Sequence, residues 1–147
     1  MRAYLDCCSL QRPLDDRGQP RINVEAEAVL TILALVESGD LELPSSEVLE
    51  FEIANGPDAQ RQARVRELLK LASQVVKVTD EIEAEAVTLV KSGIKPIDAL
   101  HLATASGTKA DYFCTCDDQL LKKGRKLKTL GETKVVSPLE LIAEVTP

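Results

Sequence analysis

The chain of 147 residues carries 24 acidic and 18 basic residues, for a formal net charge of −6, and 44% of its residues are hydrophobic. This composition fits one domain with a real core and excludes a disordered chain. Only 3% of the residues are aromatic, which argues against binding of single strands by base stacking. Because the chain is acidic, any binding of nucleic acid requires a local basic patch or metal ions.

The amino terminus predicts a short strand, and its apolar residues end at Asp6. No apolar segment typical of a signal peptide follows, and no window reaches the roughly 20 apolar residues of a transmembrane helix. We therefore expect a soluble, cytoplasmic protein without membrane association, whose four cysteines are reduced thiols. Residues 11–23 are polar, include two prolines and one glycine, and are predicted to form a loop.

Short strands and amphipathic helices alternate through the rest of the chain. Asn23 is predicted to cap a helix that ends at Gly39. Asp80 is predicted to cap another helix, with Glu83 at the spacing of a capping box and Gly93 at the end. The other predicted elements are a strand at 41–43, helices at 45–54 and 58–73, a strand at 75–78, a helix from Pro96, a strand at 111–115, a short helix after Asp117, a strand at 134–136 and a helix from about Pro138.

Strands separated by helices predict a parallel sheet that is covered on both faces. Right-handed crossover connections then produce a three-layer α/β/α sandwich. The sequence shows no internal repeat and no convincing linker, so a single domain over residues 1–147 is expected.

Sites in an open parallel sheet form beyond the carboxyl ends of the strands, and acidic residues gather at that edge of the predicted fold. Asp6 ends the first strand, and Asp117 follows a later one. Asp98 lies in the first turn of an apolar helix that leads into this later strand, and the 45–54 helix carries glutamates near the same edge. The bland interpretation of Asp98 is an acid that complements the helix dipole. The sharper one is a cluster of four carboxylates.

Carboxylates that lie close together raise each other's pKa, and bound cations neutralise their repulsion. Mg²⁺ and Mn²⁺ prefer oxygen ligands, and the single histidine excludes a His-rich zinc site. Two such ions can activate a water and stabilise the leaving oxygen of a phosphodiester. The pattern therefore predicts a metal-dependent nuclease.

Four segments, "YLDCC", "SSEVLEFEI", "KPIDALHLATA" and "YFCTCDDQLL", resemble in order and approximate spacing the segments that mark the PIN domain. Over nearly its whole length the chain looks like a VapC-like ribonuclease of the PIN superfamily. The resemblance implies a PIN-like, 5'-nuclease-like fold and an endoribonuclease that cleaves RNA with a metal-activated water. It also implies a homodimer, a cognate antitoxin and a toxin-like role.

The same resemblance implies that Asp6, Glu52, Asp98 and Asp117 bind Mg²⁺ or Mn²⁺ and carry catalysis. Glu52 fits the family pattern, an acid followed by a hydrophobic residue with a glycine four residues on, and Glu50 is the alternative. Supporting roles are expected for Asp118, as a helix cap or an outer group, and for Thr115, through hydrogen bonds to the acids.

The chain departs from VapC-like proteins after the first aspartate, where Cys7 and Cys8 replace the common Thr-Asn pair. This departure puts the local support of Asp6 in doubt. The cysteines are interpreted as small buried residues at strand ends, and a disulfide between the first strand and the 111–115 strand is a minor hypothesis. His101 is expected to be a histidine at the edge of the core with local hydrogen bonds.

Five basic residues follow Asp117 within seven positions: Lys122, Lys123, Arg125, Lys126 and Lys128. They form either a solvated loop or a phosphate clamp for RNA. Weaker candidates of the same kind are Arg12, Arg17 and Arg21. The alternative function is a catalytically weak or inactive PIN-like domain that binds RNA or a protein partner.

Overall fold

Five short parallel strands lie at the centre of the computed structural model, which describes residues 1–147. They are β1 (Ala3–Leu5), β2 (Ser45–Ser46), β3 (Val75–Val76), β4 (Tyr112–Cys114) and β5 (Lys134–Val136). Three strands form a sheet in the order β1-β4-β5, and β2 pairs with β3. A parallel bridge between Arg2 and Glu42 places the segment that leads into β2 beside β1.

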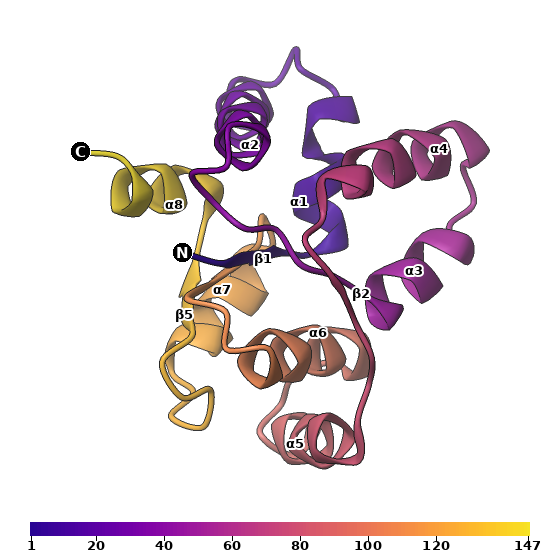
Figure 1. Ribbon diagram of the computed structural model, residues 1–147, viewed down its shortest axis with the longest axis vertical. Coiled ribbons are helices and arrows are strands. Elements are labelled where there is room, and N and C mark those ends of the chain that lie inside the picture. Colours follow the sequence, from indigo (N-terminus) through magenta and orange to yellow (C-terminus); the bar gives the residue numbers. More distant parts are fainter.

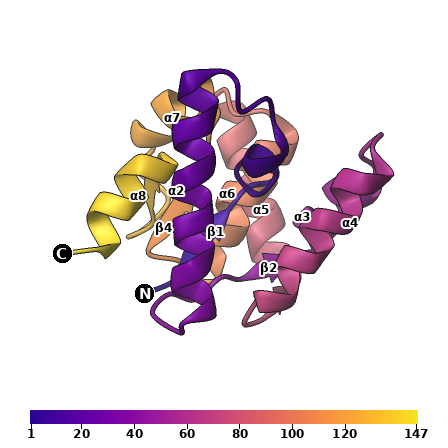
Figure 2. The same ribbon diagram turned by 90° about the horizontal axis from the view of Figure 1, so that it is seen from above.

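Helices cover both faces of the sheet. They are α1 (Cys7–Gln11), η1 (Arg12–Leu14), α2 (Pro20–Glu37), α3 (Glu47–Ala54), α4 (Ala59–Leu68), η2 (Leu69–Leu71), α5 (Asp80–Lys91), α6 (Pro96–Gly107), α7 (Asp118–Arg125) and α8 (Pro138–Val145). Helices α2 and α8 pack together on one side, and α5 and α6 on the other (Figure 1). Figure 2 shows α3 and α4 next to each other, at the end of the molecule opposite α8. The predicted α/β fold with a central parallel sheet between helices is confirmed.

The core is aliphatic around one aromatic pair. Tyr4 of β1 and Phe113 of β4 are fully buried, and their rings stack with centroids 5.7 Å apart. Ile32 of α2, Leu102 of α6 and Leu141 of α8 belong to the same buried cluster. Helices from both layers therefore bury their apolar sides in one continuous core, which is the main stabilising contribution. None of the helices combines the length and hydropathy needed to cross a membrane.

The carboxyl ends of the three main strands meet at one edge. Leu5 pairs with Cys114, and Cys114 pairs with Val136. Just beyond them, the amide of Asp6 donates to the carbonyl oxygen of Cys114 at 3.2 Å, and the amide of Thr115 donates to that of Val136 at 3.0 Å. The segments that follow β1 and β4 therefore emerge side by side at this edge.

The predicted loop at 11–23 is the largest difference between prediction and structure. Helix α1 already begins at Cys7, η1 continues to Leu14, and α2 begins at Pro20. Asn23 therefore lies inside α2 and does not cap it. Proline at the first helical position has its φ angle preset and lacks an N–H that would be unpaired there, so the helix begins one turn earlier than the prediction.

Two other elements are displaced by a few residues. Thr79, rather than Asp80, caps α5, so no capping box with Glu83 forms there. The predicted strand at 41–43 contributes only an isolated bridge, and β2 lies at Ser45–Ser46. Neither displacement changes the order of helices and strands along the chain.

Candidate functional site

Asp6 lies where β1 turns into α1, and the side chain is buried. Its Oδ1 accepts hydrogen bonds from the amide of Ser9 at 3.0 Å and from the Cys8 thiol at 3.1 Å. The first of these bonds makes Asp6 the N-cap of α1. Both bonds end on Oδ1, so Oδ2 receives no hydrogen bond from the protein.

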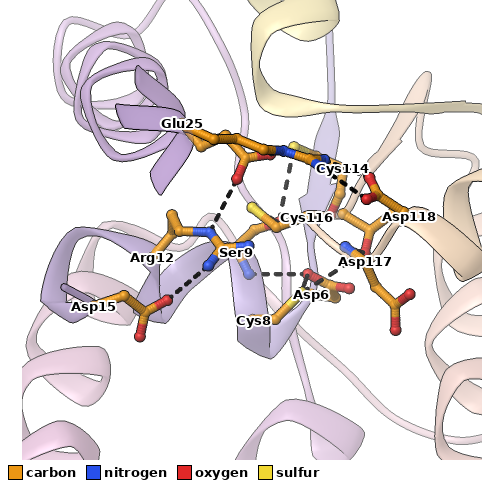
Figure 3. Close-up of polar contacts among 12 residues, drawn as sticks. Asp6, Cys8, Ser9, Arg12, Asp15, Glu25, Cys114, Cys116, Asp117 and Asp118 are labelled. Carbon is orange, nitrogen blue, oxygen red and sulfur yellow. Dashed lines mark hydrogen bonds and ion pairs between the residues drawn. The ribbon is translucent and has the colours of Figure 1, made fainter. Parts of the chain in front are cut away.

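Asp117 has the same local architecture at the end of β4. It caps α7, and its Oδ1 accepts from the amides of Gln119 at 2.9 Å and Leu120 at 3.2 Å. The hydroxyl of Thr115 accepts from the amide of Asp117 at 3.1 Å, which fixes the turn between strand and helix. Because β1 and β4 are paired neighbours, the two capping aspartates belong to adjacent strand ends; Figure 3 shows Asp6, Cys8 and Asp117 together.

Asp98 comes from a third segment of the chain and lies in the first turn of α6. It lines a small pocket together with Asp117, Lys95 and Lys123. Burial raises the pKa of Asp98, and the charge of Asp6 raises it further. Asp117 and Glu52 act in the same direction. Asp98 therefore lies within electrostatic reach of the three other acids.

Glu52 and Glu50 face different parts of the surface. Oε1 of Glu52 is 2.8 Å from Nε2 of His101, a residue of α6 one turn after Asp98. Glu50 instead lines a hollow between α3, α4 and β3, beside Arg66 and Lys70. This hollow is larger than the pocket of Asp98, but only Glu50 among its lining residues is acidic. The geometry therefore places Glu52, and not Glu50, with the aspartates.

The four acids do not form an enclosed site for a metal ion. No group of three or more His, Cys, Asp or Glu side chains is arranged closely enough to hold a metal ion by itself. Mg²⁺ usually keeps several waters and binds through one or two carboxylates, so it does not need such a group. The donor set is all oxygen, as hard cations require.

Asp118 and the arginines of the amino-terminal segment are occupied by ion pairs. Arg21 forms a two-pronged pair with Asp118, which lowers the pKa of that carboxyl. Asp118 is the first residue of α7 and not its cap, because Asp117 caps the helix. Arg12 contacts Glu25 at 3.3 Å and Asp15 at 3.0 Å (Figure 3). Arg17 bonds to Glu27 in the same way. These arginines join α2 to η1 and α7, and none is a free phosphate clamp.

The basic residues after Asp117 do not act as one group. Only Lys123 lines the pocket of Asp98, and its Nζ donates to the carbonyl oxygen of Gly93 at 3.1 Å. Arg125 pairs with Glu140 of α8. Lys95 was not anticipated from the sequence, although its position just before Pro96 places it at the start of the same helix as Asp98.

The thiol of Cys8 donates a hydrogen bond to Oδ1 of Asp6. The Cys7-Cys8 pair therefore still gives Asp6 local support, which the sequence had put in doubt. All four cysteines are free thiols, and Cys8 is the exposed one. The interpretation of the cysteines as small buried residues holds for Cys7, Cys114 and Cys116. The expectation of local hydrogen bonds for His101 is wrong, because its partners lie 49 and 97 residues away in the sequence.

Replacing Asp98 by asparagine is expected to raise the thermal stability of the metal-free protein at pH 7. The folded-state pKa of Asp98 is raised, so its ionised form opposes folding above that pKa. The opposition disappears as the pH falls and the carboxyl binds a proton. The difference in melting temperature between the variant and the wild type should therefore shrink toward pH 4.

The matched control is Asp80→Asn, which removes an exposed acid from the first turn of α5. There the charge complements the helix dipole, and its loss should cost about 0.3–1 kcal/mol. Thermal unfolding followed by circular dichroism measures both variants. A lower melting temperature for Asp98→Asn at pH 7 would contradict the crowding of acids around this residue.

Comparisons with known proteins identify the family and support the fold. Residues 21–126 match the model of the PIN domain family. A chain of VapBC2 from Rickettsia felis, in a structure bound to a promoter DNA fragment, superposes with a TM-score of 0.61 at 11% identity, over 93% of this chain and 98% of that one. A chain of FitAB bound to an IR36 DNA fragment gives a TM-score of 0.58 at 16% identity, over 92% and 94%. No curated protein matches the sequence significantly.

Proposed function

Because the chain belongs to the PIN domain family, we propose that it is a single-domain endoribonuclease that depends on Mg²⁺ or Mn²⁺. The observation that carries the proposal is the approach of Asp6, Glu52, Asp98 and Asp117 to one another from four separate segments. Burial and the other acids raise the pKa of Asp98, so the site is a place where a divalent cation relieves repulsion.

The proposed chemistry is hydrolysis of a phosphodiester. A divalent ion bound by the four acids would supply an activated water and stabilise the developing charge on the phosphate. The chain itself holds the carboxylates in place, since Asp6 and Asp117 are each fixed by hydrogen bonds at a helix N-terminus. No side chain needs to act as a covalent nucleophile.

The substrate class is RNA, held through its phosphates. Lys95 and Lys123 line the pocket of Asp98 and Asp117, where their charges offset the acids and can contact the backbone on either side of the reacting phosphate. Contacts of this kind position the strand without reading its sequence. The side chains of Lys122, Lys126 and Lys128 in the same segment are also exposed and could contact phosphates farther along the strand.

We also propose a toxin-like assembly, a homodimer that pairs with a cognate antitoxin. Its support is the resemblance to VapC-like proteins and the superposition on VapBC2 and FitAB, both bound to DNA in the similar structures. Co-expression with the neighbouring gene product, followed by size-exclusion chromatography with light scattering, measures both features.

Cleavage of a fluorescent single-stranded RNA by the purified chain tests the function. We expect turnover in Mn²⁺ or Mg²⁺, complete loss in EDTA, and recovery when excess Mn²⁺ is restored. The direct role of the cation in the chemistry predicts an all-or-none response. Binding of the RNA without cleavage in Mn²⁺ would contradict the proposal and favour the alternative, a PIN-like domain that acts as a binding module.

A further inference from the structure

A chain of buried polar side chains ends on Glu52. His101 is 1% exposed, and its Nδ1 lies 2.7 Å from the hydroxyl of Tyr4, which is fully buried. The Tyr4 hydroxyl is 2.7 Å from that of Ser46, which accepts from the amide of Leu49 at 3.0 Å. At the other end, His101 Nε2 lies 2.8 Å from Glu52 Oε1. The chain joins β1, the start of α3 and α6.

The hydrogen bonds in this chain can run in one direction only. The amide of Leu49 always donates, so the oxygen of Ser46 accepts there and its hydrogen must go to Tyr4, the remaining partner. Tyr4 then donates to Nδ1 of His101. With Nδ1 as an acceptor, the neutral imidazole carries its proton on Nε2 and donates it to Glu52. The opposite direction leaves the buried hydroxyl hydrogen of Ser46 without an acceptor, which is costly.

Glu52 needs such an anchor more than the aspartates do. Asp6 and Asp117 are short side chains, each held by backbone amides at a helix N-terminus. The Glu52 side chain has three rotatable bonds and is 36% exposed, and the only hydrogen-bond partner of its carboxylate is His101. Repulsion from the other acids favours its rotation into solvent. A buried donor with a fixed tautomer opposes that rotation.

We propose that His101 is a positioning residue: held in one tautomer by Tyr4 and Ser46, it orients the Glu52 carboxylate toward the divalent cation of the acidic site. His101 is not itself a ligand, because both ring nitrogens are already bonded to the protein. The inference rests on the proposed function, since it assigns the support of that same site. Mutation of a residue that hydrogen-bonds to a metal ligand typically lowers the metal affinity 10- to 100-fold.

Two amide replacements of His101 separate positioning from packing. Glutamine extends a donor to about the position of Nε2, so His101→Gln keeps the contact with Glu52. Asparagine places its polar atoms near Nδ1, so His101→Asn keeps the contact with Tyr4 and loses Glu52. The variants are compared by Mn²⁺ binding to the full chain in isothermal titration calorimetry without RNA, and by the Mn²⁺ concentration that gives half-maximal cleavage.

We expect His101→Asn to weaken Mn²⁺ binding about 10- to 100-fold, and His101→Gln to recover most of that loss. Glu52→Gln should weaken binding at least as much, and adding His101→Asn to it should cost little more, because His101 acts through Glu52. Tyr4→Phe keeps the ring that stacks on Phe113 and should weaken binding in the same direction. If a His101 variant does not fold, Mn²⁺ binding by Tyr4→Phe still tests the inference.

The outcomes distinguish this inference from the proposed function. Wild-type protein that binds Mn²⁺ and cleaves RNA, with His101→Asn binding Mn²⁺ equally well, overturns the positioning role alone. Wild-type protein that binds Mn²⁺ without cleaving RNA overturns the function, while the binding series still decides the role of His101. Wild-type protein that binds no Mn²⁺ overturns both. Equal losses for the asparagine and glutamine variants would assign His101 to packing.

Discussion

Replacing Asp98 by asparagine is expected to lower metal-dependent cleavage of RNA at least about a hundredfold, although the folded protein is no less stable than the wild type. The loss of an outer partner of a metal ligand already costs 10- to 100-fold, so the loss of a direct ligand should cost more. Asparagine keeps the shape of the side chain but not the charge that attracts the cation. Initial rates in saturating Mn²⁺ measure the effect, and circular dichroism checks the fold.

The matched control comes from the two neighbouring glutamates of α3. Glu52→Gln should cause a loss comparable with that of Asp98→Asn, because Glu52 bonds to His101 at the acidic site. Glu50→Gln removes the same charge from the separate hollow beside Arg66 and should cleave at close to the wild-type rate. Cleavage by Asp98→Asn at the wild-type rate, or equal losses in the two glutamate variants, would rule out the proposed set of ligands.

Replacing Phe113 by alanine is expected to destabilise the fold by about 3–5 kcal/mol, the usual cost of removing a buried phenylalanine. Phe113 lies in β4, between β1 and β5, and is fully buried against Tyr4. A domain of this size has a free energy of unfolding of only about 5–15 kcal/mol, so the variant should lose much of its stability. Equilibrium unfolding in urea gives the difference directly.

Leu139→Ala provides the comparison, since Leu139 in the first turn of α8 is 51% exposed. A surface change of this kind should stay within about 0.5 kcal/mol of the wild type. If Phe113→Ala costs less than about 1 kcal/mol, the aromatic pair is not the centre of the core. The variant should also weaken Mn²⁺ binding, because Tyr4 then loses the ring on which it stacks.

Prediction from the sequence succeeded where local signals are strong. Pro96 opens α6 at its first position. Gly93 follows the end of α5 with a φ of +97°, which glycine adopts more easily than other residues. It failed for α1, because five residues are too short to show a helical period. The apolar residues before Asp6 predict a strand, and Asp6 both follows that strand and caps the short helix α1.

The sequence by itself determined the alternation of strands and helices, and hence a parallel sheet with acids at its carboxyl edge. It also indicated which aspartates gather at that edge, since Asp6 and Asp117 each follow a strand and Asp98 lies in the first turn of a helix. These features depend on neighbours a few residues apart, so the local pattern contains them.

The tertiary structure alone decided which glutamate joins the aspartates, and what His101 does. Glu50 and Glu52 lie on the same helix, and only the packing of α3 against α6 turns Glu52 toward His101. The partners of His101 come from β1 and α3, far away in the sequence. Contacts between distant segments depend on strand pairing and on how whole helices pack, and neither is contained in the local order of residues.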